Sequence, residues 1–295
     1  MRAWQFSKPK NPGFGLSKGF YLSVLSSRAV MPSIVEIINP TGEGGAASGM
    51  CAPLTGDTDK ARLAKPLSRG PYAVATRDRK TIIKMVVLSK EEAGYDPETF
   101  ARSSLAANAD PELIARLRAT WTLAQFTFES HDPMVYPALD FLLGVCCRVA
   151  LLSDGLVADP ISQRYLLPHE VFHSNRIDPR IDARDHVSVR FRSRPEGLHA
   201  FTLGMQKFAL PEYEITGLAD ADADSAARFL LVIAQTTLTG NLCKEGSLYG
   251  SPKAAFEARS GGFDRSLWEG LEVLELLPPT KFTASEALHA WLSEL

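Results

Sequence analysis

An apolar segment between two strand-like runs constrains this fold more than any other part of the chain. From Met134 to Leu152 the only charged residues are Asp140 and Arg148, which predicts a helix that is buried on most sides. A run with apolar residues on both faces, Trp121 to Glu129, precedes the helix, and the short run Gly155 to Ala158 follows it. The order strand, helix, strand predicts two strands that lie parallel in one interior sheet.

The same apolar segment approaches the length of a membrane-spanning helix, which requires about 20 apolar residues. Its two central charges and Pro137 favour a buried core helix instead. Charges over the whole chain are nearly balanced, with 32 Lys and Arg against 34 Asp and Glu in 295 residues. This balance argues against a membrane partner, and it argues against a nucleic-acid partner unless a local basic patch supplies the charge.

The N-terminal region differs in composition from the rest of the chain. Residues 1–35 contain no acidic residue, are rich in Gly, Pro and Ser, and include a short apolar run at Phe20 to Leu25. We expect residues 1–70 to form an irregular or weakly docked extension, with a short strand at Ser33 to Ile38. The alternatives are a leader that targets the chain to an organelle and a true start at Met31. Cysteine usage favours a cytoplasmic location, because Cys146 and Cys147 are adjacent in the apolar segment and fit no disulfide framework.

Residues 71–295 carry a regular pattern of strands and helices. Two hairpins are expected, the first from Pro71 to Leu88 and the second from Val187 to Met205, in which Val187, Val189 and Phe191 should face inward. A second buried helix is expected at Ala226 to Leu238. The remaining helix starts are marked by Asp96-Pro97, Asp110-Pro111 and the capping box of Thr283 and Glu286. The sequence therefore predicts one α/β (or α+β) domain with a mixed sheet, two buried helices and a C-terminal helix.

The motif His169-Glu170-Val171-Phe172-His173 has the H-E-x-x-H form of zinc hydrolases. On an α-helix, His169 and His173 would share one zinc ion, and Glu170 would act as general base. Pro168 and Asp178-Pro179 leave little room for that helix, and no third ligand stands at a recognised spacing. The alternative is a surface turn without metal, and we expect no bound zinc and no other cofactor.

Arg190, Arg192 and Arg194 occupy alternate positions of one expected strand, so three guanidinium groups lie along one line. Such a row suits phosphate, carboxylate or nucleic acid. The alternative is an edge strand that is protected by charge, with Asp178, Asp182 and Asp185 as neutralising partners. The isolated histidines His131, His199 and His289 are expected to cap helices or to lie on the surface.

Three segments together resemble uncharacterised bacterial α/β proteins that are classed as domains of unknown function. They are Gly155 to Pro160 leading into Leu166-Leu167-Pro168, Phe201 to Met205, and Leu210 to Ile215. The resemblance covers about residues 71–240. It implies the fold and a bacterial, cytosolic setting, but it assigns no activity and no site residue.

No nucleophile, base and orienting group occur together in a consistent structural context. The sequence therefore favours a non-catalytic intracellular binding or regulatory module whose partner is another protein or a small anionic ligand. The alternatives are a zinc-dependent hydrolase that uses His169, Glu170 and His173, and a phosphate- or nucleic-acid-binding protein that uses the arginine row.

Overall fold

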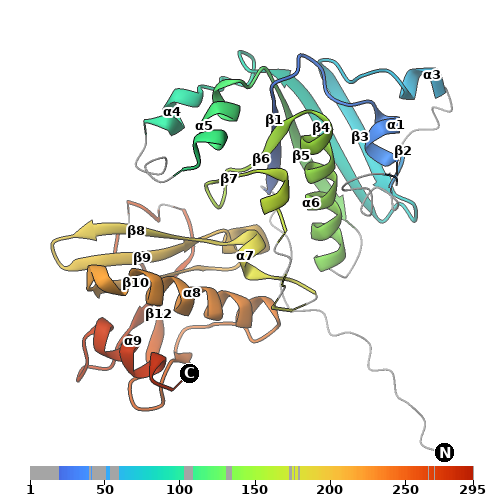
Figure 1. Ribbon diagram of the computed structural model, residues 1–295. Coiled ribbons are helices and arrows are strands. Elements are labelled where there is room, and N and C mark those ends of the chain that lie inside the picture. The colour runs from blue at the N-terminus through green and yellow to red at the C-terminus, as the bar shows by residue number, and fades with distance from the viewer. Residues whose placement is uncertain are drawn as a thin grey trace, which may run out of the picture. The chain divides into compact units, whose positions relative to one another are not determined.

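The computed structural model describes residues 20–39, 41, 51–53, 60–102, 109–130, 135–172, 175, 177–178, 180–264, 266–268 and 270–294. The chain divides into two compact units (Figure 1). We call residues 19–174 the N-terminal unit and residues 175–295 the C-terminal unit. Both units combine helices with sheet, which confirms the predicted fold class. The division differs from the expected single domain over residues 71–295.

The described part of the N-terminal unit forms a seven-stranded sheet in the order β2-β3-β4-β5-β1-β6-β7. Its strands are β1 (Tyr21–Ser26), β2 (Cys51–Pro53), β3 (Gly70–Thr76), β4 (Thr81–Ser89), β5 (Thr122–Ser130), β6 (Gly155–Asp159) and β7 (Arg164–Leu166). Its helices are α1 (Ile34–Ile38), α3 (Lys60–Leu63), α4 (Pro97–Ala101), α5 (Pro111–Arg118), α6 (Val135–Leu152) and the 3-10 helix η2 (Pro168–Glu170). The expected hairpin of β3 and β4 is confirmed.

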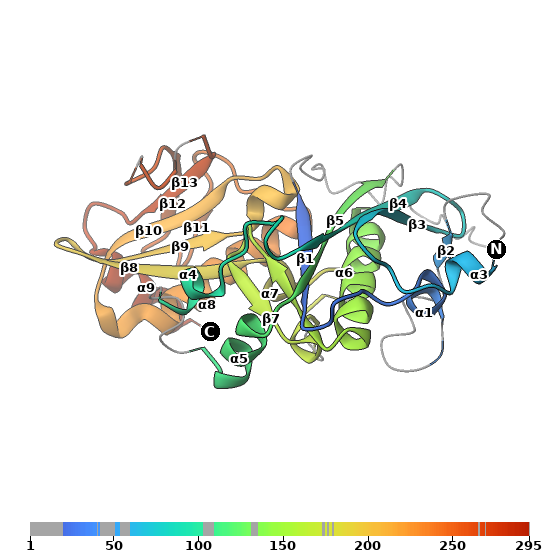
Figure 2. The ribbon, with the colours of Figure 1, turned by 90° about the horizontal axis from the view of Figure 1, so that it is seen from above.

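Strand β1 lies in the middle of this sheet, paired antiparallel with β5 on one side and with β6 on the other. Strands that are antiparallel to the same neighbour run parallel to each other, so β5 and β6 are parallel, as predicted, with β1 between them. Helix α6 connects them and packs on all three strands (Figure 1, Figure 2). The predicted buried helix is therefore confirmed. Asp132-Pro133 has the sequence pattern of a start for this helix, like Asp96-Pro97, but these two residues lie outside the described part of the chain.

The segment before residue 71 is not an irregular extension where the structure describes it. Val24 in β1 is fully buried, because the strand has a neighbour on both sides and α6 packs on the sheet. The strand expected at Ser33 to Ile38 was wrong, since α1 occupies those residues. The physical reason is a capping box: the Ser33 side chain accepts from the Glu36 backbone N–H, and the Glu36 carboxylate accepts from Ser33.

The described part of the C-terminal unit forms a six-stranded mixed sheet in the order β11-β12-β13-β10-β9-β8, with β10 parallel to β13. Its strands are β8 (Ser188–Arg194), β9 (Gly197–Leu203), β10 (Glu212–Leu218), β11 (Leu248–Tyr249), β12 (Phe256–Ser260) and β13 (Val273–Leu277). Its helices are α7 (Ala183–His186), α8 (Ala223–Leu238), α9 (Ala284–Leu292) and the 3-10 helices η3 (Met205–Phe208) and η4 (Asp220–Asp222).

Helix α8 is the second buried helix, as predicted, and it packs on β8, β9 and β10 (Figure 1). The last helix, α9, begins with the predicted capping box of Thr283 and Glu286. Phe191 was expected to face inward, but its side chain is 40% exposed. It lies on β8, an edge strand whose only neighbour in the described sheet is β9, so less of the core covers it. None of the helices in the described part of the chain combines the length and apolar character that a membrane crossing requires.

Candidate functional site

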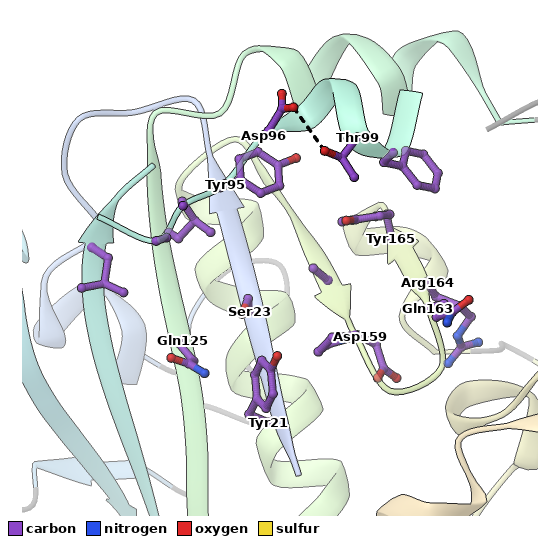
Figure 3. Close-up of a pocket in the computed structure, with 17 residues that line it drawn as sticks. Tyr21, Ser23, Tyr95, Asp96, Thr99, Gln125, Asp159, Gln163, Arg164 and Tyr165 are labelled. Atoms are coloured by element: carbon purple, nitrogen blue, oxygen red, sulfur yellow. Dashed lines mark hydrogen bonds between the residues drawn. The ribbon is translucent and has the colours of Figure 1, made fainter. Parts of the chain in front are cut away.

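A pocket of about 610 Å³ lies on the face of the N-terminal sheet opposite to α6 (Figure 3). Its floor comes from the centre of the sheet. Ser23 on β1 pairs in register with Gln125 on β5 and with Ala158 on β6, so the three side chains share one face. Tyr21 lies on the same face, two residues before Ser23 on the strand. Every residue that lines the pocket belongs to the N-terminal unit.

The segment from Ala93 to Phe100 closes one side of the pocket. Asp96 caps α4, because its carboxylate accepts from the Glu98 backbone N–H at 3.0 Å and from the Thr99 hydroxyl at 3.1 Å (Figure 3). This cap fixes the turn that carries Tyr95. The start of α4 at Asp96-Pro97 was predicted from the sequence and is confirmed.

Aromatic side chains form the upper end of the pocket. The rings of Phe100 and Tyr165 meet edge to face, with centroids 4.6 Å apart. Tyr95 and both of these rings pack on an apolar cluster that includes Leu123 and Ala158. Burial raises the pKa of Tyr95 and of Tyr165 above the usual phenol range, so both hydroxyls stay protonated at neutral pH.

The lower end of the pocket offers uncharged polar groups. Within the described part of the chain, the side chains of Tyr21, Ser23 and Gln125 make no hydrogen bond. The Gln125 amide provides donors and an acceptor, and each hydroxyl can do either. These three neighbouring groups are therefore available to a ligand.

The charged groups around the pocket already take part in the local structure. The Asp96 carboxylate caps α4. Asp159 is buried and accepts from the Ser162 backbone N–H at 3.2 Å, and Arg164 donates to the Ser162 hydroxyl, also at 3.2 Å. A ligand would therefore meet uncharged polar groups on the floor and aromatic rings at the upper end.

The structure places the H-E-x-x-H residues at the end of the N-terminal unit. His169 and Glu170 lie on η2, a short 3-10 helix, and the Glu170 carboxylate accepts from the Leu167 backbone N–H at 2.8 Å. His173 lies outside the described residues. Within the described ranges, no group of three or more His, Cys, Asp or Glu side chains is arranged to hold a metal ion. The expectation that this motif binds no zinc stays a prediction, with the zinc-dependent hydrolase as its alternative.

Arg190, Arg192 and Arg194 share one face of the edge strand β8, as predicted. Arg192 stacks over the Phe201 ring, with its guanidinium carbon 5.7 Å from the centroid, and lies 3.8 Å from the Asp264 carboxylate. Arg194 also pairs with Asp264. Arg192 and Arg194 therefore share Asp264 as their partner acid. Of the acids expected from sequence proximity, Asp182 pairs with Arg184 and Asp178 pairs with Arg180.

A buried carboxylate in the C-terminal unit was missed by sequence reasoning. Glu214 on β10 lies 2.8 Å from His199 Nε2 and accepts from the indole N–H of Trp268 at 2.6 Å. His199 was expected to cap a helix or lie on the surface, but it is only 1% exposed. His199 is buried because its side chain lies on the face of β9 that Trp268 covers, where it pairs in register with Arg192 of β8. His289, by contrast, is on the surface, as expected, and contacts Asp222. His131 lies outside the described residues.

The pocket was also missed, because it forms through the pairing of β1 with β5. A usable signal was present in the run Tyr21 to Leu25. Tyrosine and serine alternate there with Leu22 and Val24, as in a strand with one polar face. Gln125 is the matching polar residue on β5, between the apolar residues Ala124 and Phe126.

Comparisons of the chain with protein-family models, with curated proteins and with solved structures find no match. The resemblance to uncharacterised bacterial α/β proteins therefore stays a prediction.

Proposed function

We propose that the N-terminal unit is a binding module for a small organic molecule, which it holds in the pocket between the sheet and the Ala93–Phe100 segment. The observation that carries this proposal is the combination of the pocket's volume with its lining. A volume of about 610 Å³ falls within the range of about 300–1,000 Å³ that is typical of small-molecule sites. Aromatic rings with a few available polar groups are the usual lining of such sites.

The pocket is built on rigid elements. Its floor is the middle of a seven-stranded sheet, and α6 supports that sheet from the other face. A capped helix positions its side wall. Rigid support of this kind lowers the entropy that is lost on binding, which favours recognition of a small ligand.

The test is a fragment screen of the full-length chain by ligand-observed NMR, repeated with Ser23→Phe. Phenylalanine at this half-buried floor position would project into the pocket and fill it. We expect a set of fragments to bind the wild-type chain and to lose binding to Ser23→Phe. Ala93→Trp, at an exposed position on the rim, tests the same point without changing the sheet.

Thermal unfolding of each variant shows whether the fold is intact. Fragments that bind folded Ser23→Phe and Ala93→Trp as tightly as they bind the wild-type chain would contradict the proposal. Complete lack of fragment binding to the wild-type chain would contradict it as well.

A further inference from the structure

We infer that the ligand is an uncharged heteroaromatic ring with a hydrogen-bond donor next to an acceptor on one edge, the class that includes nucleobases and unphosphorylated nucleosides. This inference rests on the proposed function. It assigns the polar edge to Gln125 and Ser23 and the ring to the aromatic end of the pocket.

Ser23 and Gln125 form a polar pair on the floor of the pocket. Both residues lie on adjacent central strands, in register, with their side chains on the pocket face. Neither side chain forms a hydrogen bond to a residue that the structure describes. A glutamine amide presents a donor and an acceptor side by side, which matches the adjacent acceptor and donor on the edge of a base such as adenine.

Two tyrosine rings lie at the end of the pocket away from Gln125 (Figure 3). Tyr95 and Tyr165 flank the upper end of the pocket, whereas Tyr21 and Gln125 lie at the lower end (Figure 3). Flat rings favour stacked or edge-on contacts with other flat rings, and bases are commonly held in this way by aromatic side chains. Tyr95 and Tyr165 stay neutral at physiological pH, so they offer ring faces and hydroxyl groups without a charge.

The charged residues around the pocket disfavour a ligand with a phosphate group. Binding of a phosphate group normally uses available Arg or Lys side chains or the exposed N–H groups of a helix start. Here Asp96 already caps the helix start at the pocket, and the Arg164 side chain donates to Ser162. Asp96 and Asp159 would in addition repel an anion. This arrangement selects an uncharged ligand over the small anion that the sequence led us to expect.

The test is a calorimetric titration of the full-length chain, which measures its affinity for each ligand. The ligands are adenine, adenosine, cytidine, adenosine monophosphate and glucose. We expect at least one base or nucleoside to bind, and adenosine monophosphate to bind more weakly than adenosine. Gln125→Leu keeps the size of the side chain but removes its donors and acceptor, so affinity should fall by about tenfold or more. Ser23→Ala should also weaken binding without filling the pocket.

Thr127→Leu is the matched control. Thr127 lies two residues after Gln125 on β5 and faces the same side of the sheet, but it is outside the pocket lining. The affinity of Thr127→Leu for the base or nucleoside should therefore equal that of the wild type. Unchanged affinity in both Gln125→Leu and Ser23→Ala would overturn the assignment of the polar edge. Preference for glucose or for adenosine monophosphate over the nucleosides would overturn the ligand class.

Failure of this inference is distinguishable from failure of the proposed function. Suppose that the fragments which bind the wild-type chain lose binding to Ser23→Phe, but that none of them contains a heteroaromatic ring. This result would overturn the inference about the ligand and would still support the proposed binding module. Fragments that bind Ser23→Phe unchanged would overturn both.

Discussion

Two acidic residues in the C-terminal unit show how local partners set the charge of a carboxyl group. Burial of Asp182 disfavours its charged form, but hydrogen bonds from the Arg184 side chain and from the backbone N–H groups of Ile177 and Arg184 outweigh it. The pKa of Asp182 is therefore well below its usual range. Burial raises the pKa of Glu275, the nearby Glu214 raises it further, and the Thr216 hydroxyl does not compensate. The two acids should affect stability in opposite directions.

For Asp182→Asn we expect the free energy of unfolding to fall by about 1–3 kcal/mol at pH 7, because the charge-assisted hydrogen bonds are weakened. The folded pKa lies below the unfolded value of about 3.9, so the stabilisation is present above that value and is lost as the pH falls through the folded pKa. Urea unfolding at pH 7, 5 and 3 should show the difference between wild type and variant narrowing in acid. The control Asp220→Asn, at an exposed position, should change little. A difference that widens in acid would contradict this assignment.

For Glu275→Gln we expect the opposite change, an increase in the free energy of unfolding at pH 7. A carboxyl group whose folded pKa is raised destabilises the fold above that pKa, so the variant should be more stable than the wild type at pH 7. Solvent screening limits the gain to less than about 1 kcal/mol, because Glu275 is only half-buried. The gain should disappear below the unfolded pKa of about 4.3. Exposed Glu272→Gln is the control, and equal stability changes in the two variants would show that burial is not the cause.

At the scale of elements, the close approach of β6 to β1 depends on a glycine. Gly155 is the first residue of β6, as the strand-like run Gly155 to Ala158 predicted, and it lies opposite Ser26 of β1. A Cβ atom at this position would overlap the Leu25 carbonyl oxygen, which belongs to the backbone and has little freedom to shift. This contact is therefore a reason for glycine that sequence pattern alone does not reveal.

The substitution Gly155→Ala tests this explanation, because the overlap predicts a loss of stability where a strand would normally gain stability. Alanine normally stabilises a strand by about 0.5–1 kcal/mol relative to glycine, because glycine loses more conformational freedom on folding. Here we expect a loss of about 1–3 kcal/mol from the overlap. Chemical unfolding of the full-length chain measures the difference. A variant as stable as the wild type, or more stable, would contradict the packing of β6 on β1.

Elements that are defined by local signals were predictable, and elements that are defined by distant pairing were not. The hairpin of β3 and β4, helices α6 and α8, and the caps at Asp96, Asp110 and Thr283 each follow from residues close together in the sequence. Strand β1 was missed, because the partners that make it an interior strand lie about a hundred residues further along the chain. The pocket depends on that pairing, so it was missed as well.

At the scale of the whole molecule, the chain has two compact units, each with its own sheet. Val24→Asp, in the middle of β1, would place an unpaired charge in the core of the N-terminal unit, which typically costs several kcal/mol. We expect limited proteolysis of this full-length variant to degrade residues 19–174 and to leave a protected fragment from about residue 175 to the C-terminus. Simultaneous loss of both units, or protection of both, would contradict the division into two units.

The central claim is that a small ring-containing ligand contacts Gln125 on the floor of the N-terminal pocket, and the side-chain amide of this residue reports on the contact directly. In a spectrum of the isotope-labelled full-length chain, its NH₂ resonances can be identified by their disappearance in Gln125→Leu. We predict that a bound base or nucleoside shifts these resonances in proportion to occupancy, and that Ser23→Phe abolishes the shift. A ligand that saturates the chain but leaves the Gln125 amide resonances unchanged would contradict the account.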